Sequence, residues 1–204
     1  MAFVIDTTSS GSNASTNALT WSHTNNGNLL VVVVGESQVR TVSSVTYNAV
    51  SLTLAITVTN GNAKAYIYYL VNPAAGANNV VVNYSTSADS IAGAASFSGC
   101  NVSDPLGQTN TVSGTAQNKS ITITPDKRDS LIIDCIGAIS GNHNPSGAGQ
   151  TEIFTGANRT GSYEILSAQQ SVLQTQSWTS DVSDIYAMVV AEFQTLPSGM
   201  FLTM

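Results

Sequence analysis

The chain has 204 residues, a formal net charge of −6, and only 9% charged residues. An ordinary soluble domain carries about 25%. Six Lys and Arg residues in all argue against a nucleic-acid partner, because phosphate binding needs a clustered basic surface. No apolar run reaches the roughly 20 residues that a membrane helix needs, so we expect no membrane partner.

Short runs of alternating apolar and polar residues, separated by Asn, Gly, Ser and Thr, indicate an all-β chain. We expect one domain over residues 1–204, built as an antiparallel, jelly-roll-like β-sandwich. In chain order the predicted strands are Ala2–Asp6, Ala18–His23, Asn28–Glu36, Val42–Tyr47, Val50–Thr59, Ala63–Leu70, Asn79–Tyr84, Ile91–Phe97, Ser120–Thr124, Leu131–Gly137, Thr151–Phe154, Gly161–Ser167, Gln174–Thr179 and Ile185–Gln194.

The start of the chain, Met1–Asp6, lacks the basic and apolar regions of a secretory signal. We therefore expect folding in a cytoplasm. The following Ser/Thr/Asn-rich stretch, Thr7–Asn17, and the later stretch Asn142–Gln150 are expected to be exposed loops.

A hairpin is predicted at Asn60-Gly61, because a type I′ turn needs positive φ at both central residues. On the strand after it, Tyr66 and Tyr68 fall on one face. They could form a ligand platform, but we favour cross-strand packing.

Three runs are continuously apolar and indicate central strands covered on both faces: Leu29–Val34, Leu131–Ile133 and Met188–Ala191. In a two-layer sandwich this requires a second layer of loops or a neighbouring subunit over the outer face.

The chain ends are candidate subunit-contact arms, namely residues 1–17 and 197–204. Each large apolar side chain left in water would lose about 1.5–3 kcal/mol of favourable burial free energy. We therefore expect docking of these ends, on this subunit or on a neighbour, to compete with fraying. The candidate contact residues are Phe3, Met200, Phe201, Leu202 and Met204.

Signals for site chemistry are weak. Cys100 and Cys135 are expected to be free thiols, and no cofactor is expected. His23 lacks neighbours at metal-ligand spacing, and His143 resembles an exposed loop tip. The pairs Asp126/Asp129 and Asp181/Asp184 could hold Ca²⁺ with turn carbonyls, but turn caps are favoured.

The two tryptophans lie in polar strand-like contexts. Trp178, and Tyr163 with it, are candidate glycan contacts, because exposed aromatic rings stack on sugars. Core packing is the competing interpretation for Trp21 and Trp178.

Residues Trp21 to Gly107 resemble a β-sandwich module of phage structural proteins and of bacterial surface or secreted proteins. The matching segments are Trp21–Thr24, Leu29–Val33, Val42–Asn48, Tyr69–Pro73 and Ala92–Phe97, with looser likeness at Gly149–Glu152 and Ser177–Thr179. The resemblance implies a scaffold, and it carries no catalytic residues with it.

From the resemblance, composition and apolar ends we expect a non-enzymatic virion structural protein of a tailed phage, foremost a capsid decoration (cement) protein. Its expected partners are itself, as a homo-oligomer with a trimer as one candidate, and a major capsid or other virion protein. Its expected location is the virion, assembled in the host cytoplasm. The alternative is a carbohydrate-binding or host-receptor-binding adhesin module.

Overall fold

The computed structural model describes residues 2–166 and 172–195, and these residues contain strands and turns only. The all-β, antiparallel expectation is confirmed. The strands are β1 (Val4–Asn25), β2 (Leu29–Glu36), β3 (Val42–Tyr47), β4 (Val50–Ser51), β5 (Thr53–Asn60), β6 (Ala63–Val71), β7 (Gly76–Ser98), β8 (Leu106–Ala116), β9 (Lys119–Ile123), β10 (Leu131–Ala138), β11 (His143–Pro145), β12 (Thr151–Gly156), β13 (Arg159–Ile165), β14 (Gln174–Ser180) and β15 (Asp184–Phe193).

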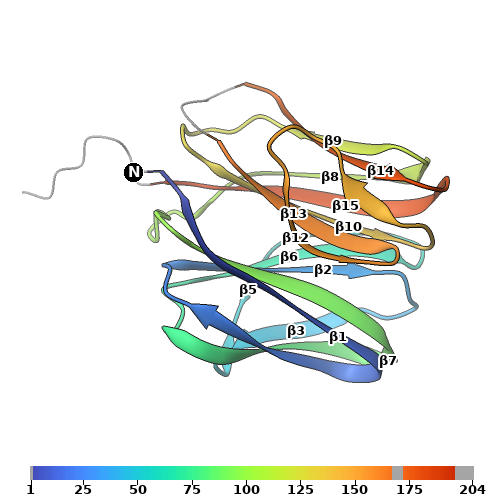
Figure 1. Ribbon diagram of the computed structural model, residues 1–204, viewed down its shortest axis with the longest axis horizontal. Coiled ribbons are helices and arrows are strands. Elements are labelled where there is room, and N and C mark those ends of the chain that lie inside the picture. Colours follow the sequence, from blue (N-terminus) through green and yellow to red (C-terminus); the bar gives the residue numbers. More distant parts are fainter. Residues whose placement is uncertain (1, 167–171, 196–204) are drawn as a thin grey trace, which may run out of the picture.

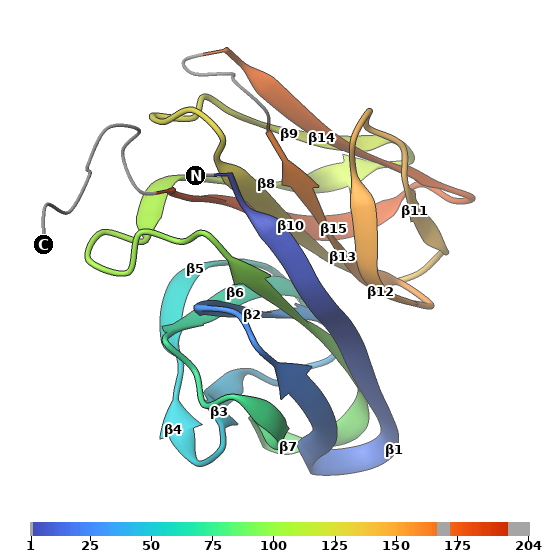
Figure 2. The same cartoon turned by 60° about the vertical axis from the view of Figure 1, so that its left-hand side comes forward.

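The strands stack in four layers, whereas the sequence predicts a sandwich of two (Figure 1). Strands β1 and β7 are long enough to run from one layer into the next (Figure 2). The first half of β7 pairs with β3 and its second half pairs with β2, while β1 pairs with β7 along both halves. The seven-stranded sheet thus folds over on itself and encloses its own core.

The second half of the chain repeats this arrangement with separate strands. Its two sheets have the orders β12-β13-β10-β15-β8 and β11-β14-β9. Counted along the chain from β8 to β15, the first of the eight strands (β8) pairs with the last (β15), and the second (β9) pairs with the seventh (β14). This pairing is jelly-roll winding. In the first half β1 supplies the first two strands of the same winding, and β7 supplies the last two.

The correspondence between the halves extends to residues. Both β2 and β10 begin with Leu and carry Gly in the seventh position. Leu29 pairs with Phe97 as Leu131 pairs with Phe193. An equivalent backbone hydrogen bond lies at the end of the β2–β6 pair and at the end of the β10–β13 pair. Asn72 N–H donates to the Asn28 carbonyl, and Leu166 N–H donates to the Ser130 carbonyl, each at 2.9 Å.

Three apolar cores separate the four layers. The central core lies between the two inner sheets and includes Leu29, Val31, Val33, Leu131, Ile133 and Phe193. The other faces of β2 and β10 line the two outer cores, where Leu30 and Val32 meet β3 and Trp178 meets Ile132. The continuous apolar runs are therefore covered on both faces by this chain's own sheets, and not by loops or a neighbouring subunit.

The predicted loop over Thr7–Asn17 is wrong, because this segment lies within β1 and pairs with β7. Its Ser and Thr side chains alternate between exposed and half-buried positions, so the segment lacks the apolar signal of a strand. The exposed edge strand β8 was not predicted either, because its residues also lack the apolar signal of a strand. In the second loop, β11 is a short strand.

The predicted hairpin is confirmed, with its turn one residue later than expected. Asn60 pairs with Ala63, and Gly61 takes the positive φ of 61° at the first central position. Tyr66 and Tyr68 are stacked with their ring centroids 6.3 Å apart in an outer core, so they pack across strands as favoured.

Candidate functional site

Phe3, an expected subunit contact, lies in the chain's own central core. It is 3% exposed and meets Phe97 edge-on at a centroid distance of 6.3 Å. Much of the predicted N-terminal arm is likewise held in β1. The other candidates, Met200, Phe201, Leu202 and Met204 in the tail 197–204, lie outside the described residues.

The two predicted glycan contacts are inside the molecule. Trp178 is 1% exposed in the core beneath β14, and half-buried Tyr163 meets Phe97 edge-on at 5.3 Å. Across residues 2–166 and 172–195, none of the aromatic side chains is exposed. Trp178 therefore presents no ring face to a sugar, and core packing explains both tryptophans.

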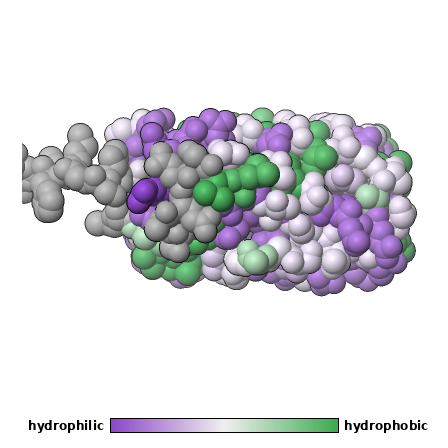
Figure 3. All heavy atoms as spheres, turned by 90° about the horizontal axis from the view of Figure 1, so that it is seen from above, coloured by the Kyte–Doolittle hydropathy of each residue, from purple (hydrophilic) through white to green (hydrophobic). Residues whose placement is uncertain are grey.

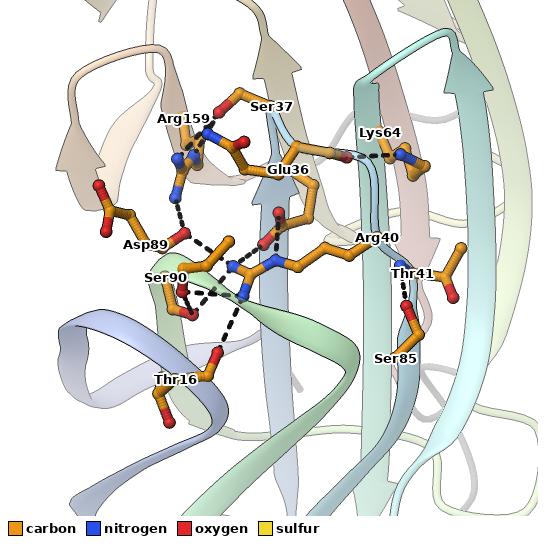
Figure 4. Close-up of polar contacts among 12 residues, drawn as sticks. Thr16, Glu36, Ser37, Arg40, Thr41, Lys64, Ser85, Asp89, Ser90 and Arg159 are labelled. Atoms are coloured by element: carbon orange, nitrogen blue, oxygen red, sulfur yellow. Dashed lines mark hydrogen bonds and ion pairs between the residues drawn. The ribbon is translucent and has the colours of Figure 1, made fainter.

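The most connected polar group in the described chain is a buried cluster around Arg40 (Figure 4). Its guanidinium forms a bidentate ion pair with Glu36, with both N–O distances 2.8 Å and both side chains 0% exposed. The remaining donors reach the carbonyls of Thr16, Ala88 and Asp89 and the hydroxyl of Ser90. Arg40 thus holds together the irregular middle regions of β1 and β7.

Arg159 connects this cluster to the second half of the chain. From β13 it donates to Ser37 Oγ at 2.8 Å and to the Asp89 carbonyl at 2.9 Å (Figure 4). Lys64 donates to the Gln38 carbonyl at 2.8 Å, and burial lowers its pKa. These contacts engage Arg40, Arg159 and Lys64 in hydrogen bonds within the protein. The described residues therefore leave no open anion site here.

A second buried carboxylate, Glu192, organises the loop that precedes β10. It accepts hydrogen bonds from the backbone N–H groups of Gln108, Asp126 and Lys127 and from Ser130 Oγ. Glu192 is fully buried, so these donors replace the water that a carboxylate otherwise needs. The adjacent Lys127 and Arg128 are exposed.

A third buried carboxylate, Asp134, lies on the outer-core face of β10. It accepts hydrogen bonds from Ser162 N–H and Oγ and from Gln150 Nε2, the last at 2.8 Å. Burial raises its pKa to about 7, against the opposing effect of these donors. Gln150 also accepts from Ser177 N–H and so ties the loop before β12 to β14.

His143 is buried, which corrects the expectation of an exposed loop tip. It lies beside a buried ion pair in which Lys119 Nζ and Asp184 Oδ1 are 2.7 Å apart. Its Nε2 is 3.7 Å from the same Asp184 oxygen, and neither ring nitrogen has a hydrogen-bond partner. Burial and the nearby Lys119 lower the pKa of His143, and the ring is therefore neutral at pH 7.

Hydrogen bonds from other segments of the chain engage three of the carboxylates considered for Ca²⁺. Asp181 accepts from Asn142 N–H at 2.9 Å, and Asp184 Oδ2 accepts from Ser140 N–H at 3.0 Å. Asp126 Oδ2 accepts from Gln108 Nε2 at 2.7 Å. No group of three or more His, Cys, Asp or Glu able to hold a metal occurs in the described part of the chain.

Both cysteines are free and buried, as expected. Burial raises the pKa of Cys100 to about 12 and also raises that of Cys135. Burial lowers the pKa of His23 to about 4, and its Nδ1 lies 2.8 Å from Ser9 Oγ. These groups are therefore uncharged at neutral pH.

The surface is accordingly poor in positive charge. Four of the six basic residues are buried, namely Arg40, Lys64, Lys119 and Arg159. The face seen from the side of β9 and β14 is mostly hydrophilic or neutral with small hydrophobic areas (Figure 3). No helix among the described residues could span a bilayer.

One edge of the outer sheet in the first half is open. There β1 pairs with β7 on one side and with no described strand on the other. Along this edge Ala18, Thr20, Ser22 and Thr24 are exposed, while Leu19 and Trp21 point into the core. The 22 residues of β1 contain neither Lys nor Pro, the residues that commonly protect edge strands from pairing.

No protein-family model matches this chain, and no curated protein sequence matches it. Among solved structures it is similar to a crystal structure of the plant receptor-like kinase FER, with a TM-score of 0.28 and 7% identity over 94% of this chain and 89% of that one. A similarity this low supports no conclusion about fold or function.

Proposed function

We propose that this protein is a non-enzymatic structural protein that acts through repeated subunit contacts, foremost a capsid decoration protein of a tailed phage. The observation that carries the proposal is the open edge of β1 over Ala18–Asn25. The backbone of Ala18 bonds to Thr16 Oγ1, and the Thr24 carbonyl accepts from Thr7 Oγ1. Between them, around Thr20 and Ser22, the edge pairs with no second described strand and carries uncharged side chains, which suits it to pairing with a strand of another copy.

The distribution of charge supports the same function. Since four of the six cations are internal and the net charge is −6, little positive charge is left at the surface to attract nucleic acid. The buried carboxylates Glu36 and Glu192 are occupied with structural hydrogen bonds. The chemistry of the described residues therefore favours cohesion and adhesion over turnover.

The adhesin alternative loses its main candidate residue, because Trp178 is buried in an outer core and half-buried Tyr163 packs against Phe97. We do not propose it.

Sedimentation velocity of the full chain over a range of concentrations tests the proposal. We expect concentration-dependent association that is weakened by the double change Thr20→Lys and Ser22→Lys, because two charges would line the open edge. Thr179→Lys, an exposed position on the central strand β14, is the matched control and should leave association unchanged.

A second measurement addresses the phage assignment. Electron microscopy of phage heads incubated with the pure chain should show ordered density at repeated lattice positions. A chain that stays monomeric at the highest concentration and adds no density to heads contradicts the proposal.

A further inference from the structure

The buried contact between Lys119 and Asp184 joins two layers of the second sandwich. Lys119 begins β9 in the outer sheet, and Asp184 begins β15 in the inner sheet. Their Nζ and Oδ1 atoms are 2.7 Å apart, with side-chain exposures of 0% and 2%. The two groups are thus held together away from water.

This contact lacks the alignment of a hydrogen-bonded ion pair. Although Lys119 Nζ is close, Asp184 Oδ1 has no hydrogen-bond partner. The Nζ group donates instead to the Gln117 carbonyl at 3.3 Å. On the other side, Ser140 N–H holds Asp184 Oδ2 at 3.0 Å and fixes the carboxyl group beside the amine.

The surroundings of the pair are largely apolar and aromatic. The Tyr186 ring lies 5.6 Å from Nζ, and the pair borders the apolar core that contains Met188 and Val190. A buried ion pair must compensate the solvation lost by both ions, whereas moving one proton from ammonium to carboxylate leaves two neutral groups. His143, with both ring nitrogens unpartnered, stands next to the carboxyl oxygen.

We propose that Lys119 and Asp184 condense without an enzyme to form an intramolecular isopeptide bond between Nζ and Cγ. The ammonium first gives one proton to the carboxylate, leaving an amine and a carboxylic acid. The amine nitrogen then attacks Cγ, the bond from Cγ to one carboxyl oxygen breaks, and that oxygen departs as water with the second nitrogen proton. His143 accepts and returns protons and ends unchanged, so no oxidant, reductant or cofactor is consumed.

The product is a covalent staple between β9 and β15 across the outer core. Cross-links restrict the unfolded chain, and those that close long loops restrict it most in the chain-entropy account. Unlike a disulfide, this staple forms in a reducing compartment. It does not depend on the proposed function.

Intact-mass measurement of the denatured full chain tests the proposal directly. We expect the protein to be lighter than its sequence mass by one water molecule. A proteolytic digest should yield a branched peptide that joins the segments containing Lys119 and Asp184. A folded protein that keeps its full sequence mass after prolonged incubation overturns the proposal.

Variants distinguish formation of this isopeptide bond from loss of a water molecule elsewhere in the chain. Lys119→Met and Asp184→Ala should each restore the full sequence mass, while Lys64→Met, which removes another buried lysine, should still show the loss. A loss of water that persists in Lys119→Met would place the dehydration elsewhere and contradict the proposal. In a time course, His143→Ala should slow formation of the bond, and an unchanged rate would contradict the proposed proton transfer.

Discussion

Tyr69 of the first sandwich meets Phe193 of the second edge-on, with centroids 5.5 Å apart and an interplanar angle of 67°. The converse contact joins Tyr163 of the second sandwich to Phe97 of the first, at 5.3 Å and 75°. Because the partners occupy corresponding positions in the two windings, the inner sheets meet in a nearly reciprocal way. The two sandwiches therefore share one apolar core across this interface.

The reciprocal pairs should contribute directly to stability. We expect a double-mutant cycle of Tyr69→Leu with Phe193→Leu to give a coupling of about 0.5–1.5 kcal/mol. The cycle of Tyr163→Leu with Phe97→Leu should give a similar value. Urea unfolding measures both, and coupling near zero in either cycle would contradict the interpretation.

The close approach of β2 and β10 should make their glycines irreplaceable. A Cβ on Gly137 would lie 2.0 Å from the Lys64 carbonyl oxygen, and one on Gly35 would lie 2.4 Å from the Ile136 oxygen. Because these obstacles are backbone atoms, Gly137→Ala should destabilise the fold by at least about 2–3 kcal/mol.

Gly114 is the matched control for this change. A Cβ there meets only the Tyr186 ring, at 3.5 Å or more, so Gly114→Ala should be tolerated. Thermal melting followed by circular dichroism compares the two variants. Equal melting temperatures would argue against a tight interface.

Removal of Arg40 should leave Glu36 as an uncompensated buried charge. We expect Arg40→Met to cost about 3–5 kcal/mol in free energy of unfolding. Arg40→Lys should rescue little, because an ammonium cannot reproduce the bidentate pair together with the bonds to Thr16 and Ala88. Denaturant unfolding provides the measurement, and full rescue by Lys would contradict the proposed geometry.

The double change Glu36→Met with Arg40→Met separates charge from packing. Since replacing a whole buried pair by apolar groups is often close to neutral, the double variant should be more stable than Arg40→Met alone.

Asp134 should make stability fall as the pH rises. Its folded-state pKa is about 7, above the ordinary value of 3.8, so the folded protein binds this proton more tightly than the unfolded chain. The stabilisation is fully present below about pH 4 and is lost as the pH rises through about 7. The loss is at most about 4 kcal/mol.

Comparison with Asp134→Asn isolates this group, because Asn keeps the shape and does not titrate. Between pH 5 and pH 7.5, the free energy of unfolding of the natural protein should decrease relative to that of the variant. His23 acts in the opposite direction, since its pKa is lowered to about 4, but it titrates equally in both proteins. Parallel pH profiles would contradict the assignment.

Local sequence patterns predicted the parts of the fold that depend on alternation and turn chemistry. The apolar run Leu29–Val34 and the Asn60-Gly61 turn both indicated their elements, since burial on two faces and positive φ are local requirements. The segment Thr7–Asn17 was missed because its strand is maintained by pairing with β7, and not by apolar burial of its own side chains.

The polar sites were less accessible to prediction. Nothing near Lys119 in the sequence indicates Asp184, and Arg159 is far from Ser37 along the chain. Such pairs arise when layers stack, so only their burial in the folded structure distinguishes them from ordinary surface charges.

The sequence by itself determined that this protein is all-β, poor in charge and built from strands that need cover on both faces. Only the tertiary structure decided that the cover comes from a second sandwich in the same chain. The physical reason is that an apolar run records how many of its faces are buried, but not which surface buries them.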